Sequence, residues 1–136
     1  MVRGVPHVCV RIRFGGKEAP VWLLVDTGAA RTTLFNRAVE ALGLSRGALE
    51  PAHAPMLGIG GPINAFLLWH VELVFDSSEG GYPLHRDLCV VLHRVAHLPL
   101  PLASRVLDLP SILGRDVIDG FRFVYERATG TVLLER

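Results

Sequence analysis

The stretch Val21-Trp22-Leu23-Leu24-Val25-Asp26-Thr27-Gly28-Ala29-Ala30-Arg31-Thr32-Thr33-Leu34 decides the fold. Its first five residues form a continuous apolar run, which is typical of a short strand buried on both faces. The run ends abruptly at Asp26, and a hydroxyl residue and a glycine follow. A carboxylate beside a buried strand is costly unless it is hydrogen-bonded, paired or protonated. The position of Asp26 therefore needs an explanation.

The simplest explanation is a turn. Asp bonds readily to its own backbone and Gly adopts positive φ, so Asp-Thr-Gly commonly ends a strand. Taken alone, the tripeptide at Asp26 favours this interpretation over a catalytic one. The rest of the sequence has to separate the two.

The segments that flank this stretch are mostly β-like. Residues 7–14 alternate, which places Val8, Val10, Ile12 and Phe14 on one face of a strand and Arg11 and Arg13 on the other. A turn is predicted at 15–18. A short helix is predicted from Asn36, as its cap, through about Leu42, with Gly43 as the stop signal.

Further strands are predicted along the remainder of the chain. They cover 53–58 and 63–75, on either side of the glycine-rich tip Gly58–Pro62, then 84–92 and the short buried pair Ile112-Leu113. Residues 94–110 contain three prolines and lack periodicity, so we expect a long loop with at most one helical turn. A short helix over 114–120 and a closing hairpin of 121–125 with 131–134 complete the prediction. The sequence predicts one all-β domain over residues 1–136 with one or two short helices.

Three segments together resemble the retropepsin family of aspartic proteases. The first is the stretch from Leu23 to Leu34, which matches the family's apolar strand, D-T-G-A and the following T-x-L. The second, Met56-Leu57-Gly58-Ile59-Gly60-Gly61, is similar to the glycine-rich tip of its flap. The third, Ile112-Leu113-Gly114-Arg115-Asp116-Val117-Ile118, resembles its I-[IL]-G-R-[DN] signature. The segments occur in the family's order, and the resemblance covers most of residues 7–134.

The resemblance implies roles for individual residues. Asp26 is the expected acid/base residue, Thr27 bonds across a dimer axis, and Gly28 lets the backbone pass close to the carboxylate. Substrate binding falls to two groups, the loop residues Ala29, Ala30 and Arg31 and the flap residues Met56, Gly58, Ile59, Gly60 and Gly61. Structural support behind the aspartate loop falls to Ile112, Leu113, Gly114 and Arg115.

Peptide hydrolysis by carboxylates needs two of them, one as general base on a water molecule and one as acid towards the carbonyl. The chain has only one Asp-[Thr/Ser]-Gly, because Asp76-Ser77-Ser78 lacks the glycine and Asp119-Gly120 lacks the hydroxyl residue. The second carboxylate must come from another copy. We therefore expect a homodimer with two Asp26 side chains at its two-fold axis.

Two departures from the family concern charge and the C-terminus. Retroviral members usually have an acidic residue after D-T-G-A that pairs with the Arg of G-R-[DN]; here that position is Ala30. Arg115 then needs another partner, for which Asp116 and Asp119 are candidates. Arg31 is exposed either to solvent or to an acidic substrate side chain. The segment 121–136 is long enough for a full hairpin, whereas viral chains end in a short intersubunit strand.

Composition excludes several other classes. Among 136 residues, half are hydrophobic and 20% are charged, and the net charge is +1; this argues against a disordered chain and against a strongly basic nucleic-acid binder. We expect no membrane span and no signal peptide, hence a cytoplasmic protein. Cys9 and Cys89 are expected to be buried, reduced thiols rather than a disulfide. The six histidines lack zinc-ligand spacing and no serine lies in G-x-S-x-G, so no metal or other cofactor is expected.

Two functions from different classes remain. The first is an aspartic endopeptidase, a homodimer that hydrolyses peptide or protein substrates. The alternative is a catalytically inactive or very slow dimeric module that keeps the retropepsin fold for binding or assembly. The intact Asp26-Thr27-Gly28 favours the enzyme, because a scaffold has no need of a carboxylate at the dimer axis.

Overall fold

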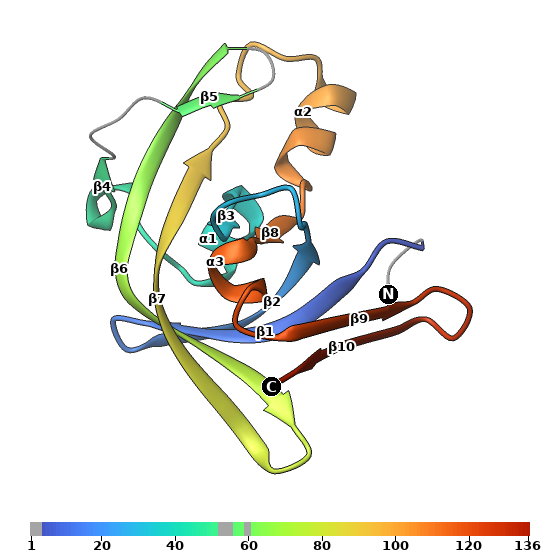
Figure 1. Ribbon diagram of the computed structural model, residues 1–136. Coiled ribbons are helices and arrows are strands. Elements are labelled where there is room, and N and C mark those ends of the chain that lie inside the picture. The colour runs from blue at the N-terminus through green and yellow to red at the C-terminus, as the bar shows by residue number, and fades with distance from the viewer. Residues whose placement is uncertain (1–3, 52–55, 59–60) are drawn as a thin grey trace.

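Strands are the main secondary structure of the chain, and most of them close into a barrel. The computed structural model describes residues 4–51, 56–58 and 61–136 (Figure 1). Its strands are β1 (His7–Phe14), β2 (Lys17–Val25), β3 (Thr33–Leu34), β4 (Glu50–Pro51), β5 (Met56–Gly58), β6 (Gly61–Ser77), β7 (Gly80–Leu92), β8 (Ser111–Leu113), β9 (Arg122–Glu126) and β10 (Thr131–Glu135). Pairing runs β1-β2-β8-β3-β7-β6, and β6 pairs back to β1. The predicted all-β architecture is confirmed.

The barrel interior holds the core. Six strands contribute hydrophobic side chains with no exposed surface, and these are Val10, Ile12, Leu23, Leu34, Val71, Leu73, Leu88, Val90 and Leu113. Burying an aliphatic side chain of this size contributes roughly 1.5–3 kcal/mol. Because β2 and β8 both supply such residues, the strands that lead to Asp26 and to Gly114 are anchored in the same core.

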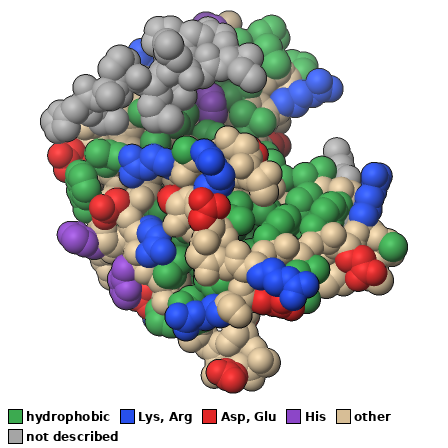
Figure 2. Space-filling view, viewed as in Figure 1, with side chains coloured by type: hydrophobic (Ala, Val, Ile, Leu, Met, Phe, Trp, Pro, Cys, Tyr) green, Lys and Arg blue, Asp and Glu red, His purple; other side chains and the backbone are tan. Residues whose placement is uncertain are grey.

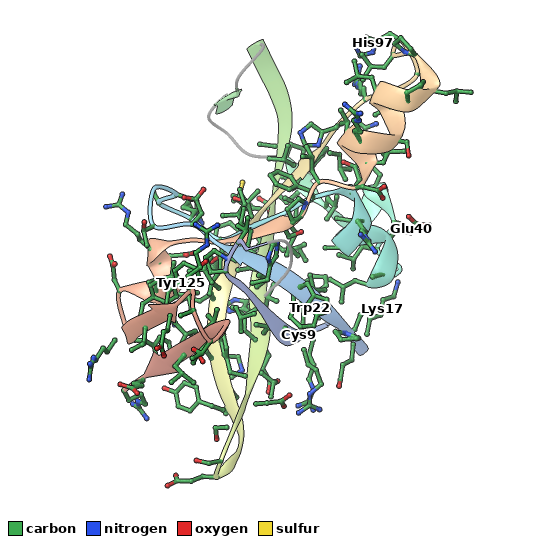
Figure 3. The ribbon with its side chains drawn as sticks, turned by 90° about the vertical axis from the view of Figure 1, so that its right-hand side faces the viewer. Cys9, Lys17, Trp22, Glu40, His97 and Tyr125 are labelled. Carbon is green, nitrogen blue, oxygen red and sulfur yellow. The ribbon has the colours of Figure 1, made fainter. Side chains whose placement is uncertain are left out.

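The outer face of β2 differs from the prediction. Val21, Leu23 and Val25 are buried, but Trp22 is 56% exposed. The expectation of a strand buried on both faces was wrong, because β2 forms the barrel wall with one side open to solvent. Cys9, the cross-strand partner of Trp22, lies on the same solvent-facing side of the sheet (Figure 3).

The cysteine prediction holds only in part. Neither Cys9 nor Cys89 is in a disulfide, and Cys89 is buried, but Cys9 is only half-buried. Burial raises the pKa of the Cys89 thiol, and a smaller opposing effect comes from the Arg31 cation. Burial, followed by the charge of Asp76, raises the pKa of Cys9. Both thiols are therefore protonated near neutral pH.

The strands β6 and β7 form a long ribbon that runs the length of the molecule (Figure 1). Their register is continuous except for an irregularity between Leu68 and Val71. Within it, His70 has a φ of 58°, and its N–H donates to Asp87 Oδ1 at 2.9 Å. A residue other than glycine is uncommon in this left-handed region. The irregularity at His70 is a β-bulge, and a bulge bends the strand that contains it.

Three α-helices and one 3₁₀ turn lie in the described residues, more than the one or two helices predicted. They are α1 (Asn36–Ala41), α2 (Leu100–Leu107), α3 (Arg115–Ile118) and the turn Arg46–Ala48. The expected loop over 94–110 contains α2, because Pro99 and Pro101 stand at the start of the helix, where proline removes no needed hydrogen bond. No described helix has the length and apolar character needed to cross a membrane.

The helix at residue 36 begins differently from the prediction. Phe35 is the N-cap, and Asn36 is the first helical residue. The Asn36 side chain instead bridges to β7's end, where its Oδ1 accepts from the His93 N–H at 2.9 Å and its Nδ2 donates to the His93 carbonyl at 3.2 Å. Gly43 ends the helix at a φ of 62°, as predicted.

The C-terminal hairpin is a separate two-stranded sheet of β9 and β10. Phe121 anchors its start through ring contacts with Phe75 and Tyr82, at centroid distances of 6.1 and 5.9 Å. The Tyr125 hydroxyl donates to the Gly4 carbonyl at 2.8 Å, which ties the hairpin to the N-terminal segment.

Candidate active site

The loop after β2 is closed by three hydrogen bonds around Asp26. The Asp26 N–H donates to the Leu113 carbonyl of β8 at 3.1 Å, and the Ala29 N–H returns to the Asp26 carbonyl at 3.2 Å. The Gly28 N–H donates to Asp26 Oδ1 at 2.9 Å. The carboxylate is half-buried and held by a backbone donor, while Thr27 and Gly28 are exposed.

Gly28 is needed at this position for space. A Cβ added there would lie 3.2 Å from Asp26 Oδ1, tighter than an ordinary contact. A larger residue would push the carboxylate away from the N–H that holds it.

The segment 114–116 lies directly against residues 29–32. The Arg115 N–H donates to the Ala29 carbonyl at 2.8 Å, and the Asp116 N–H donates to the Ala30 carbonyl at 3.2 Å. At Gly114 a Cβ would meet the Arg31 carbonyl carbon at 2.4 Å, so the two backbones touch. The structure therefore brings Ala29, Ala30 and Arg31 together with Leu113, Gly114 and Arg115.

Thr32 and Asp116 add further contacts between these two segments, which together form a brace behind the aspartate loop. Thr32 has no exposed surface, and its N–H and hydroxyl both donate to Asp116 Oδ1, at 2.9 and 2.7 Å. The hydroxyl oxygen in turn accepts from the Gly114 N–H at 3.0 Å. Sequence reasoning missed this pair; the signal that could have found it is a threonine just after the loop, where a buried hydroxyl needs a partner.

The expected partners of Arg115 do not pair with it. Asp116 Oδ1 is occupied by Thr32, and neither Asp116 nor Asp119 forms an ion pair with Arg115 within the described ranges. The short helix α3 directs Arg115 outward, and its side chain is exposed.

Strand β5 and the first residues of β6 lie at one end of the long ribbon (Figure 1). Strand β5 pairs with the start of β6 in the register Met56↔Ile63, Leu57↔Pro62 and Gly58↔Gly61. Ile59 and Gly60 lie outside the described residues. The backbone is thus a hairpin where the sequence predicts a flap, at the same end of the molecule as α2 (Figure 1); the flap role itself stays a prediction.

Two surface hollows lie away from Asp26. One of about 640 Å³ separates the C-terminal hairpin from the β6–β7 turn and is lined by Tyr82 and Phe121, among others. The other, of about 720 Å³, is lined by Trp22, parts of α1 and the segment before β8. Asp26 lines neither. Within the residues that the structure describes, no group of three or more His, Cys, Asp or Glu could hold a metal ion.

A closed barrel with an Asp-Thr-Gly loop braced by a G-R-D segment is a retropepsin-like fold. The family model described as aspartyl protease matches residues 10–86, more than half of the chain. The chain belongs to this family of aspartyl proteases.

Solved structures agree with this fold. The EIAV protease complexed with the inhibitor HBY-793 is 20% identical, with 88% of this chain and 89% of that chain covered and a TM-score of 0.55. A retropepsin-like aspartic protease from Rickettsia conorii is 18% identical, with 89% and 85% covered and a TM-score of 0.54. The retroviral protease-like domain of Ddi1 from Leishmania major is 14% identical, with 97% and 90% covered and a TM-score of 0.56. No curated protein is a significant match to the sequence.

Proposed function

We propose that the protein is an aspartic endopeptidase in which two Asp26 carboxylates, one from each subunit of a homodimer, activate a water molecule. The observation that carries this proposal is the state of Asp26 in the folded chain. Its carboxylate ends a buried strand, accepts the Gly28 N–H at 2.9 Å and is still half-exposed. A group that is both oriented and accessible is what acid/base chemistry requires.

The chemistry follows from the properties of two carboxylates at one site. Like charges a few ångströms apart do not both ionise at low cost, so the pair shares one proton. The ionised member takes a proton from water, and the protonated member donates to the scissile carbonyl. The resulting hydroxide adds to the carbonyl carbon and forms a tetrahedral diol. Its collapse breaks the C–N bond as the carboxyl that gained the proton gives it to the leaving nitrogen, so no metal and no covalent bond to the enzyme is required.

The second copy supplies what one chain lacks. The sequence has a single Asp-Thr-Gly, and the exposed Thr27 hydroxyl stands beside Asp26, where a partner subunit can reach it. A two-fold axis at this point makes the interface isologous, so each subunit gives and receives the same contacts. The hairpin of β5 and β6 would then cover an extended peptide and exclude water.

The test compares the wild type with Asp26→Asn on a diverse peptide library from acidic to neutral pH. Asp26→Asn keeps the size of the side chain and an oxygen that can accept from Gly28. We expect cleavage by the wild type, a bell-shaped dependence of kcat/KM on pH, and no cleavage by the variant.

Two other outcomes have defined meanings. Equal products from both proteins would remove Asp26 from the mechanism. An absence of cleavage by a wild type that is dimeric in light scattering would support the inactive binding or assembly module.

A further inference from the structure

Three arginines lie on, or bond to, the two segments that meet beside the aspartate loop. Arg31 lies on the loop, and its backbone touches Gly114; Arg115 follows directly and bonds to the Ala29 carbonyl. From β7, Arg86 donates its Nε to the Asp116 carbonyl at 3.3 Å. The Thr32 carbonyl accepts from the Cys89 N–H at 3.2 Å, which places the backbone next to Arg31 against β7 as well.

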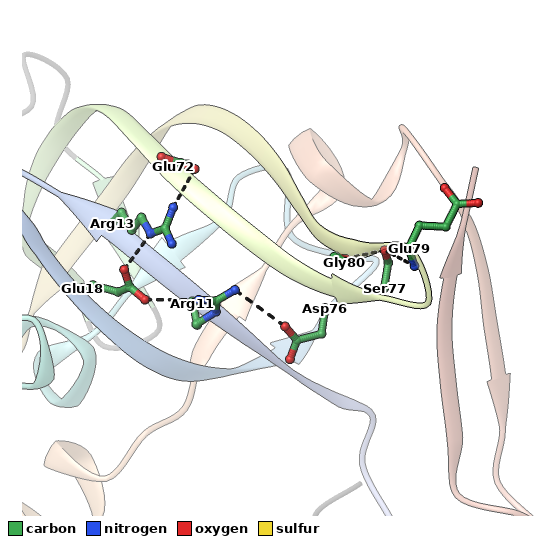
Figure 4. A network of polar contacts seen from close by, with 8 residues as sticks. All are labelled: Arg11, Arg13, Glu18, Glu72, Asp76, Ser77, Glu79 and Gly80. Atoms are coloured by element: carbon green, nitrogen blue, oxygen red, sulfur yellow. Dashed lines mark hydrogen bonds and ion pairs between the residues drawn. The ribbon is translucent and has the colours of Figure 1, made fainter.

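The charges of these arginines are not matched by carboxylates. The ion pairs of the described residues join Arg11 and Arg13 to Glu18, Glu72 and Asp76, and Arg122 to Glu135. Figure 4 shows the first network on β1 and its neighbours. Arg31, Arg86 and Arg115 take part in none of these pairs, and Arg86 donates only to carbonyl oxygens.

The surface around them is charged and accessible. Arg31 and Arg115 are exposed, and Arg86 is half-buried behind them. Figure 2 shows Lys and Arg side chains gathered with acidic ones on the part of this face where α3 lies in Figure 1. Asp116 contributes one negative charge to this region, and its Oδ1 is held by both donors of Thr32 rather than by an arginine.

The group also lies close to Asp26. The Asp26 carbonyl accepts from the Ala29 N–H, and the Ala29 carbonyl accepts from the Arg115 N–H, so two hydrogen bonds connect the backbone of Asp26 to the backbone of Arg115. An extended peptide advances about 3.3 Å per residue. Because residues 29–31 follow Asp26 closely in the chain, a peptide bound at Asp26 would bring side chains two or three residues from the scissile bond near this loop.

We propose that Arg31 and Arg115, supported by Arg86, form a subsite for a carboxylate side chain of an extended peptide, so that substrates with Asp or Glu near the scissile bond are preferred. The inference rests on the proposed function, since it gives that site a substrate class. A guanidinium offers a planar pair of donors that matches a carboxylate, which favours Asp or Glu over a neutral amide.

Binding is measured without turnover, on the dimeric Asp26→Asn protein. Two fluorescent peptides differ only in Glu or Gln at one position, which is moved along the chain in a set. We expect the Glu peptide to bind more tightly at one or two positions, with the difference reduced by salt. In Arg31→Gln/Arg115→Gln the affinity for the Glu peptide should fall by about fivefold, while that for the Gln peptide is unchanged.

Arg105→Gln is the matched control, because Arg105 is an exposed arginine on α2 outside the cluster. An equal loss in this control would mean general attraction between charges, and the subsite would be rejected. Equal binding of Glu and Gln peptides at every position would also reject it. If light scattering showed that the double variant no longer dimerises, the arginines would serve the subunit interface instead.

The two proposals fail separately. Wild-type cleavage with no preference between Glu and Gln peptides would reject the subsite and support the proposed protease. The protein could instead cleave no peptide and still bind the Glu peptides more tightly through the two arginines. That outcome would reject the protease and support the carboxylate site.

Discussion

At the scale of single residues, the site depends on how closely two backbones approach. Arg31 and Thr32 pass Gly114 at distances that leave no volume for a side chain. Thr32 is fully buried, and its two donors both use one oxygen of Asp116. A buried donor without a partner costs more than an ordinary hydrogen bond contributes. Both features brace the loop of Asp26 without touching the reacting atoms.

Gly114→Ala should destabilise the protein, because the new Cβ would lie 2.4 Å from the Arg31 carbonyl carbon. Overpacking against backbone typically costs about 1–3 kcal/mol, and we expect the upper end. Urea unfolding measures it. The matched control is Gly47→Ala, where a Cβ meets nothing within 4 Å. Equal stability of the two variants would contradict the close approach.

Substituting Asp116 by Ala or by Asn should lower the stability of the fold to different extents. In Asp116→Ala both Thr32 donors lose their partner, and we expect a loss of about 3 kcal/mol. Asp116→Asn keeps an oxygen acceptor and should lose clearly less. Denaturant unfolding of both variants gives the comparison. A larger loss for Asn than for Ala would show that the acceptor is not what holds Thr32.

At the scale of elements, the sequence predicted strand positions well wherever alternation or a glycine marked them. The bounds of β1, β8 and the closing hairpin came from such local signals. The errors came from tertiary context. Trp22 reads as part of a buried run but lies on the open side of the wall, and Asn36 bonds to His93 rather than capping its helix. The Thr32–Asp116 pair joins residues 84 positions apart, beyond any local pattern.

The ion pairs between β1 and β2 should make stability depend on acid. The hydrogen bond from Arg13 at 2.7 Å, and after it the charges of Arg13 and Arg11, lower the pKa of Glu18 below its ordinary 4.5. A lowered pKa in the folded state contributes stability above 4.5 that is lost as the pH falls through the folded value.

Wild type and Glu18→Gln should therefore differ in Tm at neutral pH, and the difference should shrink as the pH falls below 4.5. Thermal unfolding across this range measures it. At neutral pH we expect the wild type to be more stable than the variant. A gap that stays constant with pH would show that the Glu18 charge does not contribute.

At the scale of the whole molecule, one chain presents one half of the proposed catalytic pair. The barrel positions Asp26, and the two hollows described above are lined by other residues. Activity then belongs to the dimer, and dilution should reduce activity per subunit as the dimer dissociates.

Mixing subunits gives the sharper measurement. Adding Asp26→Asn protein to a fixed amount of wild type should lower the activity, because mixed dimers have one carboxylate. The control is Arg105→Gln, which keeps Asp26 and should not inhibit. Undiminished activity in the mixture, with exchange of subunits shown by fluorescence transfer, would contradict a shared site.

The brace between residues 29–32 and 114–116 also determines when the site can form during synthesis of the protein. A growing polypeptide leaves the ribosome from its N-terminus, so Asp26 emerges long before Asp116, which follows Thr32 by 84 positions. At about 5–20 residues per second, the aspartate loop spends several seconds without its support. Under the proposed function, the site cannot cut nascent chains, its own included, until the late part of the sequence has been synthesised and folded.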